Sequence, residues 1–234
     1  MKKLLLVTSL ILLAACSANK NIKTELYNDL SSKKVQYSDS TLEDIAKIKP
    51  QINPPIKIAV SQPTGNGNRF RSSNDWSAEE IQEIEAWFPQ LQSAGLASEL
   101  VVIPRSLQQG CCLKNFDIRT AAAKLQADAV IIVDDSVITD SYVNPLSFLN
   151  FTIIGMWVVP GHHRDSYEAL EASLVDTKNG YIYGVARGDG EEKKIRPYMY
   201  ADYDVGQSEA RLQALKSLGK NIVEKVATSL KGKK

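Results

Sequence analysis

Residues 127–134 constrain the fold of this chain more than any other stretch. Their sequence, Ala-Asp-Ala-Val-Ile-Ile-Val-Asp, places five consecutive apolar residues between two aspartates. Such a run is typical of a strand that is covered on both faces, as at a central position of a sheet. We therefore expect the rest of the chain to supply a layered fold around this strand.

The flanking segments predict strands and helices in alternation. Residues 56–60 and 99–104 are strand candidates. Ser77 and Glu80 form a capping box that opens a helix ending near Gly95, and Asn115 or Asp117 caps a second helix that runs to residue 127. The fold class that follows is α/β (mixed α+β), a mixed β-sheet with packed helices. The apolar residues expected to face the core from these helices are Ile81, Ile84, Trp87, Phe88, Leu91, Ile118, Ala121, Ala122 and Leu125.

A hairpin and a long helix are predicted in the second half of the chain. Runs at 167–176 and 181–187 are joined by Thr177–Gly180, and Asn-Gly between such runs favours a turn in which both central residues have positive φ. The tripeptide 187–189, Arg-Gly-Asp, is interpreted as a turn. A closing amphipathic helix is expected at about 207–230, with one stripe made of Leu212, Leu215, Leu218, Ile222, Val223, Val226 and Leu230.

The amino terminus has the pattern of a bacterial lipoprotein signal peptide. Lys2 and Lys3 precede an apolar core from residue 4 to 14, which is too short to span a bilayer. The core ends in Leu-Ala-Ala-Cys at residues 13–16, which matches a lipobox, with cleavage predicted between Ala15 and Cys16. The alternative is an ordinary signal peptide that ends near a cysteine. The predicted organisation is a signal peptide at 1–15, a lipidated flexible tether at 16–55 and a periplasmic α/β domain at 56–234.

Lipidation of Cys16 would place the chain in the cell envelope. Two or more acyl chains, of which palmitate is one candidate, anchor a protein stably, whereas one chain is marginal. Ser17 stands where aspartate is the usual signal for retention at the inner membrane, so we expect the outer membrane, with the domain facing the periplasm. The predicted partners are the membrane, through the lipid, and an envelope protein, and the chain could form an oligomer.

Charge and cysteine content exclude other classes. Removing the signal lowers the basic count from 28 to 26 against 27 acidic residues, so nothing indicates a nucleic-acid partner. Cys111 and Cys112 remain as adjacent thiols in an oxidising compartment. They could form a disulfide, vicinal or between chains, or stay reduced and buried; without further ligands they do not predict a metal site.

Residues 146–159 are the most apolar stretch of the mature chain. Leu149, Phe151 and Ile153 alternate with Asn150 and Thr152, which predicts a half-buried strand at the start of the stretch. One interpretation is that the stretch belongs to the core. The other is that it forms a surface for a membrane or a partner.

Two motifs resemble known envelope proteins. Residues 125–132, Leu-Gln-Ala-Asp-Ala-Val-Ile-Ile, and residues 174–184, Leu-Val-Asp-Thr-Lys-Asn-Gly-Tyr-Ile-Tyr-Gly, resemble elements of domains related to the amino-terminal domain of TolB and the curli secretion lipoprotein CsgG. The apolar stretch between them, closed by Pro160-Gly161, is similar to the rhombotarget lipoproteins, whose carboxy-terminal sorting tail this chain lacks. The resemblance implies a non-enzymatic structural, assembly or secretion-accessory role.

Residues that could support catalysis are few. Asp134 and Asp135 end the apolar strand, and His162 and His163 are adjacent. Neighbouring side chains of an extended segment point to opposite faces, so a common metal site is disfavoured. We predict no enzyme activity and no cofactor. The alternatives are a periplasmic metal-dependent hydrolase that uses these four residues, or an oligomeric secretion component of the CsgG type.

Overall fold

The computed structural model describes residues 42–64, 75–108, 114–200 and 205–231. Its centre is a five-stranded mixed sheet in the order β2-β1-β3-β4-β5. β1 is parallel to β2 and to β3, whereas β3, β4 and β5 are antiparallel neighbours. The α/β class predicted from the sequence is confirmed. The strands are β1 (Ile56–Val60), β2 (Ala97–Val102), β3 (Ala129–Val143), β4 (His162–Asp176) and β5 (Ile182–Arg196).

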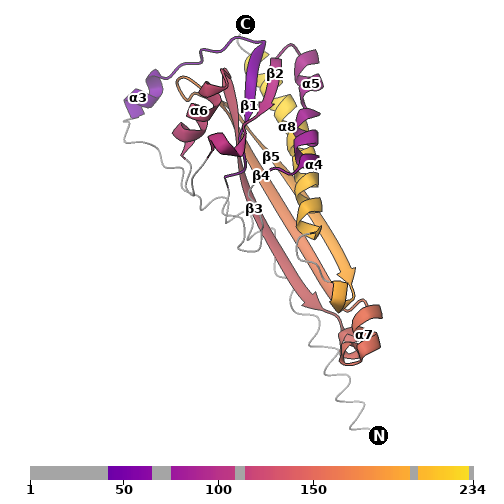
Figure 1. The fold of residues 1–234 in the computed structure, drawn as a ribbon. Helices are drawn as coiled ribbons and strands as arrows, with labels where there is room; N and C mark the ends of the chain where they lie inside the picture. The colour runs from indigo at the N-terminus through magenta and orange to yellow at the C-terminus, as the bar shows by residue number, and fades with distance from the viewer. Residues whose placement is uncertain (1–41, 65–74, 109–113, 201–204, 232–234) are drawn as a thin grey trace.

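Three of the strands are much longer than the other two and form a projecting ribbon. β3, β4 and β5 each have 15 residues, whereas β1 has 5 and β2 has 6. β1 pairs with β3 only over residues 129–131, and the rest of β3 continues beyond β1 with β4 paired along its other side. At about 3.3 Å per residue, a strand of this length spans about 50 Å. Figure 1 shows the ribbon running from the body of the molecule to α7 (Ile153–Val158) at its far end.

Three helices cover one face of the sheet. The longest is α8 (Val205–Lys231), which lies along β5 and β4, and α4 (Ala78–Glu85) and α5 (Phe88–Ser93) lie beside it (Figure 1). Burial of apolar side chains between these layers is the main favourable contribution to folding. The largest of the fully buried apolar side chains in this layer are Trp87, Ile56, Ile58, Ile84, Leu91, Leu96, Ile131, Leu170 and Leu215.

The helix α6 (Asn115–Lys124) covers the opposite face of the sheet. It buries Ile118, Ala121 and Ala122 against side chains of the central strands, among them Val130 and Ile132 of β3. Residues 129–133 are at most 4% exposed, so the central strand is covered on both faces as its apolar run predicts. A short 3-10 helix, η1 (Arg105–Leu107), follows β2.

The helix predicted to begin at the Ser77 capping box is two helices. The capping box itself is confirmed, since Ser77 accepts from the Glu80 amide and Glu80 accepts from the Ser77 amide. The break follows from Pro89, which has no amide hydrogen and whose ring would clash with the carbonyl of Glu85 in a continuous helix. α4 therefore ends at Glu85, and α5 restarts with the proline in its first turn.

The predicted hairpin is confirmed, but its turn and its length differ from expectation. Gly180 has φ of +77°, whereas Asn179 does not have positive φ, so the connection is not the two-residue turn expected. The carbonyl of Asp176 accepts from the Gly180 amide and closes the turn. The turn predicted at 187–189 is wrong, because these residues continue β5 and pair with β4.

The residues before β1 are joined to the hairpin. The backbone amides of Gln51 and Ile52 donate to the hydroxyl of Tyr183, and Asn179 Nδ2 donates to the carbonyl of Lys49. A short helix, α3 (Leu42–Lys47), precedes this contact. The division into signal peptide, tether and domain stays a prediction. Among the residues described, no helix is both long enough and apolar enough to cross a bilayer.

Candidate functional site: an exposed apolar tip

The far end of the ribbon carries most of the exposed apolar side chains that the structure describes. There the chain forms a 3-10 helix, η2 (Pro145–Phe151), then α7, and after β5 a second 3-10 helix, η3 (Tyr198–Tyr200). Together with the strand ends beside them, we call these elements the apolar tip. It holds thirteen of the eighteen exposed large hydrophobic residues in the described ranges: Tyr142, Val143, Leu146, Phe148, Phe151, Ile153, Ile154, Trp157, Val158, Ile195, Tyr198, Met199 and Tyr200.

The strand predicted from the alternation of Leu149, Phe151 and Ile153 is wrong. The segment forms two short helices, and Phe151 and Ile153 are 96% and 76% exposed. Alternation predicts a strand only where one face is buried, and no other element in the described ranges covers these side chains to hold them in register. Of the two interpretations left open, core or surface, the structure supports the surface.

Two polar side chains hold the backbone of the tip. Asn144 accepts from the Leu146 amide at 3.0 Å and donates to the carbonyl of Pro160 at 3.0 Å, which joins the two ends of the connection. Thr152 accepts from the Gly155 amide at 2.9 Å and donates to the carbonyl of Leu149 at 2.7 Å. Asn144 is therefore the N-cap of η2 and Thr152 the N-cap of α7, a position at which both residue types are favoured.

Aromatic and imidazole rings form the base of the tip. His163 stacks on Tyr142 with 4.8 Å between ring centroids, and Nε2 of the same histidine is 3.1 Å from Asn144 Nδ2. Trp157 of α7 meets Tyr200 of η3 edge to face at 5.7 Å. The His162 ring lies 5.1 Å from that of Tyr198. These contacts join the two chain segments that make up the tip.

The Tyr142 hydroxyl stays protonated at neutral pH. Partial burial is the main cause that raises the pKa of Tyr142. The charge of Asp165, whose carboxylate is 3.5 Å away, raises this pKa further. Both effects disfavour the phenolate, so this position adds no negative charge to the tip at physiological pH.

Replacing Gly155 by alanine should open the tip without unfolding the domain. A Cβ at this position would lie 1.9 Å from the carbonyl oxygen of Leu149, so α7 and η2 cannot keep their present approach. In a core, overpacking of this kind costs about 1–3 kcal/mol, but local opening of the exposed tip relieves the overlap at a lower cost. We expect faster hydrogen exchange at the Gly155 and Val159 amides and little change in the urea midpoint. Val158→Ala, in the same helix at an exposed position, is the matched control; equal exchange in the two variants would contradict the prediction.

The four residues of the predicted hydrolase alternative do not form one site. Asp135 pairs with Leu170 across β3 and β4, whereas His162 pairs with Val143, eight residues further along β3. That separation is about 26 Å at the rise of a strand. Asp134 accepts a hydrogen bond from Thr64 on the face opposite to Asp135. These four residues therefore do not form the common site that the hydrolase alternative requires, and the described residues contain no group of three or more His, Cys, Asp or Glu that could hold a metal.

A buried ion pair that the sequence analysis did not identify lies between α4 and α8. Arg211 Nε is 3.1 Å from Glu80 Oε1, and the two side chains are 1% and 8% exposed. The guanidinium also lies over the ring of Trp76, 4.4 Å from its centroid. A signal was available, because Arg211 precedes Leu215 and Leu218 by four and seven residues and so occupies the buried stripe of α8. Leu212, which was assigned to that stripe, is only half-buried.

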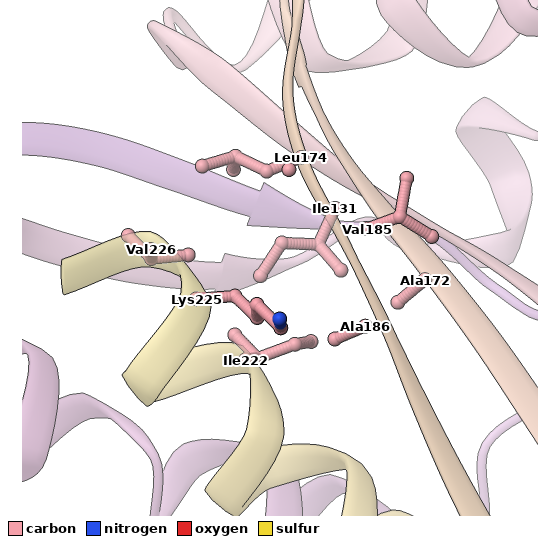
Figure 2. Close-up of a pocket in the computed structure, with 9 residues that line it drawn as sticks. Ile131, Ala172, Leu174, Val185, Ala186, Ile222, Lys225 and Val226 are labelled. Atoms are coloured by element: carbon pink, nitrogen blue, oxygen red, sulfur yellow. The ribbon is translucent and has the colours of Figure 1, made fainter. Parts of the chain in front are cut away.

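A small pocket lies between α8 and the strands (Figure 2). Ile222, Lys225 and Val226 of α8 face Ile131 of β3 and Ala186 of β5 across it. Only about 10 Å³ is open to a water-sized molecule. Small-molecule sites measure roughly 300–1,000 Å³, so this pocket is a packing gap rather than a substrate site.

The remaining predicted site residues lie outside the described ranges. These are Ala15 and Cys16 at the expected cleavage site, and Cys111 and Cys112, for which a disulfide and reduced thiols were both left open. Lipidation, cleavage and the redox state of the cysteine pair stay predictions.

Comparisons with known proteins return low similarity. No family model matches the chain, and no curated protein matches it. A neuraminyllactose-binding hemagglutinin homolog from Helicobacter pylori is similar at 15% identity and a TM-score of 0.39, covering 85% of this chain and 96% of that one. The PelC dodecamer from Paraburkholderia phytofirmans is similar at 12% identity and a TM-score of 0.33, and the match covers 77% of this chain and 91% of that one. Lipoprotein GNA1162 from Neisseria meningitidis is similar at 16% identity and a TM-score of 0.33, and the match covers 74% of this chain and 99% of that one.

At TM-scores below 0.5, these similarities do not establish a common fold, and no function follows from them. The resemblance to TolB and CsgG is not confirmed by them and stays a prediction.

Proposed function

We propose that this chain is a membrane-anchored periplasmic lipoprotein with a non-enzymatic role in the cell envelope: structural, in assembly, or accessory to secretion. The observation that carries the proposal is the Leu-Ala-Ala-Cys motif at residues 13–16 behind two lysines and an apolar core. Cys16 becomes the acylated first residue of the mature chain, and Ser17 favours the outer membrane.

The apolar tip supports an interaction role over a catalytic one. Contiguous exposed apolar patches of more than a few hundred Å² mark surfaces that meet a protein or a membrane. The two aspartates and the two histidines considered for catalysis lie far apart along the ribbon, and the pocket of Figure 2 is too small for a substrate. An envelope protein partner belongs to the proposal.

Metabolic labelling with radioactive palmitate tests the anchor. We expect label on the wild-type protein and its complete loss in the Cys16→Ser variant, because the Cys16 thiol is the attachment point for the diacylglycerol and the later acylation of the terminal amine depends on it. We also expect the labelled protein to sediment with outer-membrane vesicles after cell fractionation.

The other two cysteines provide the matched control. Cys111→Ser and Cys112→Ser should both keep the label, since neither follows a lipobox. An unlabelled wild-type protein, or label that persists in Cys16→Ser, would refute the anchor.

A further inference from the structure

We propose that the apolar tip inserts into the interfacial layer of a lipid bilayer and gives the protein a second membrane contact, separate from the acyl chains. The inference rests on the proposed location at a membrane but not on acylation of Cys16. Lipid, rather than another protein, is the proposed partner of the tip, and four features of the tip support this choice.

The first feature is the charge of the tip. Residues 141–163 and 195–200 contain no Asp, Glu or Lys, and Arg196 is their only arginine. Protein interfaces carry a polar rim around their apolar centre, whereas a segment that enters a bilayer must avoid charge, above all carboxylates. Arg196 lies at the base, where it pairs with His162 across β4 and β5 and can meet lipid phosphates.

The second feature is the side-chain capping of the two short helices η2 and α7. Apolar lipid offers no hydrogen bonds, so any segment that enters it must pair its own amides and carbonyls. The starts of helices normally leave amides to water. In the tip, side chains of Asn144 and Thr152 accept from the Leu146 and Gly155 amides, and Val159 donates to the carbonyl of Gly155.

The third feature is the order of residue types along the tip. The most exposed side chains belong to η2 and α7, where Phe151, Ile153 and Ile154 are between 76% and 96% exposed. Trp157 and Tyr200 lie together in the edge contact described above. Tryptophan and tyrosine prefer the level of the headgroups, and apolar side chains insert about 5–10 Å below it.

The fourth feature is the reach of the amino-terminal segment. The chain leaves the domain at the hairpin, where Lys49 contacts Asn179, at the opposite end of the ribbon from the tip. The roughly 26 residues from Cys16 to residue 41 can extend over about 86 Å, which exceeds the length of the ribbon even without the span of α3. The acyl chains and the tip can therefore occupy the same bilayer.

Vesicle flotation tests the inference on the full mature chain with Cys16→Ser, which carries no lipid. The vesicles contain phosphatidylethanolamine and phosphatidylglycerol. We expect the protein to float with them, and the F151S/I154S variant to partition at least about tenfold more weakly, because two large apolar side chains no longer enter the bilayer. Binding should persist at high salt, since the tip holds one formal charge.

The matched control is F116S/I182S, which removes the same pair of residue types from exposed positions on α6 and β5 away from the tip. It should float within about twofold of the unsubstituted chain. Equal flotation of the two double variants, or no flotation of any, would overturn the inference. Tip-dependent self-association in sedimentation, without flotation, would instead assign the tip to a second copy of the chain. A wild-type protein that takes up no palmitate, alongside intact flotation of the Cys16→Ser chain, would refute the anchor and leave the tip standing.

Discussion

Gly190→Ala should destabilise the domain by about 3 kcal/mol or more, toward the upper end of what overpacking costs. The Cα of Gly190 faces α8 so closely that an added Cβ would lie 1.8 Å from the carbonyl oxygen of Ala210 and 2.7 Å from the Ala214 amide nitrogen. Both contacts are with helix backbone, which cannot rotate away. The helix must shift off β5 or the strand must bend, and either change opens the largest layer of the core.

Urea unfolding followed by circular dichroism would measure the effect. Gly206→Ala is the matched control, because its Cβ would meet only the side chain of Ser166, whose hydroxyl would be 3.3 Å away, and alanine favours a helix. We expect the control to lie within about 1 kcal/mol of the wild type. A Gly190→Ala protein as stable as the control would contradict the close packing of α8 on β5.

Glu80→Gln should destabilise the domain by about 3 kcal/mol. The substitution removes the charge that faces Arg211 at 3.1 Å, and the arginine is 1% exposed. Breaking a buried ion pair leaves a charge in a poorly solvated site, which costs roughly 3–5 kcal/mol. The capping box should survive, because glutamine can still accept from the Ser77 amide. The lower end of the range is therefore expected.

Glu79→Gln is the matched control for the ion pair. Glu79 occupies the same first turn of α4 but is exposed, so its loss should cost no more than about 0.5 kcal/mol. A double-mutant cycle with Arg211→Gln isolates the pair, and we expect a coupling energy above about 1 kcal/mol. Additive effects in that cycle would show that Glu80 and Arg211 do not act as a pair.

Local patterns predicted the body of the fold well. The apolar run at 129–133, the Ser77 capping box and the hairpin around Gly180 were each predicted from a local pattern, and each is present, although the turn of the hairpin differs from the type expected. The length of the ribbon was not predictable in the same way. Asp134, Asp135 and Ser136 interrupt the apolar run, and β3 continues through them because β4 pairs with it as far as Val143. Strand length here is set by the partner strand rather than by propensity.

The close approach of α8 had a signal in the sequence of β5. Gly188 and Gly190 alternate on one face of β5 beyond Ala186, and small residues on one face allow a helix to come near. Interpreting 187–189 as a turn treats Gly188 as a flexible link. In the structure, α8 packs against the face of β5 that carries Gly188. A Cβ added to Gly188 would lie 2.2 Å from the carbonyl oxygen of Ala214.

The tip was predictable from its composition but not in its structure. An apolar stretch is usually buried. If one face of this stretch were buried, the alternation of Leu149 and Phe151 with polar residues would indicate a strand. Pro145, Thr152 and Gly155 instead favour two short capped helices. The aromatic run 198–200 gives no signal by itself, because its contact with Trp157 depends on the register of β4 and β5.

Fluorescence of Trp157 tests most directly whether the tip meets a bilayer. Trp157 is 46% exposed, whereas Trp76 and Trp87 are 5% and 2% exposed and supply a constant background. With vesicles whose acyl chains carry bromine, we predict a blue shift and quenching of the emission, both abolished by Trp157→Phe. Emission that is unchanged by brominated vesicles under conditions where the protein floats with them would contradict insertion of the tip.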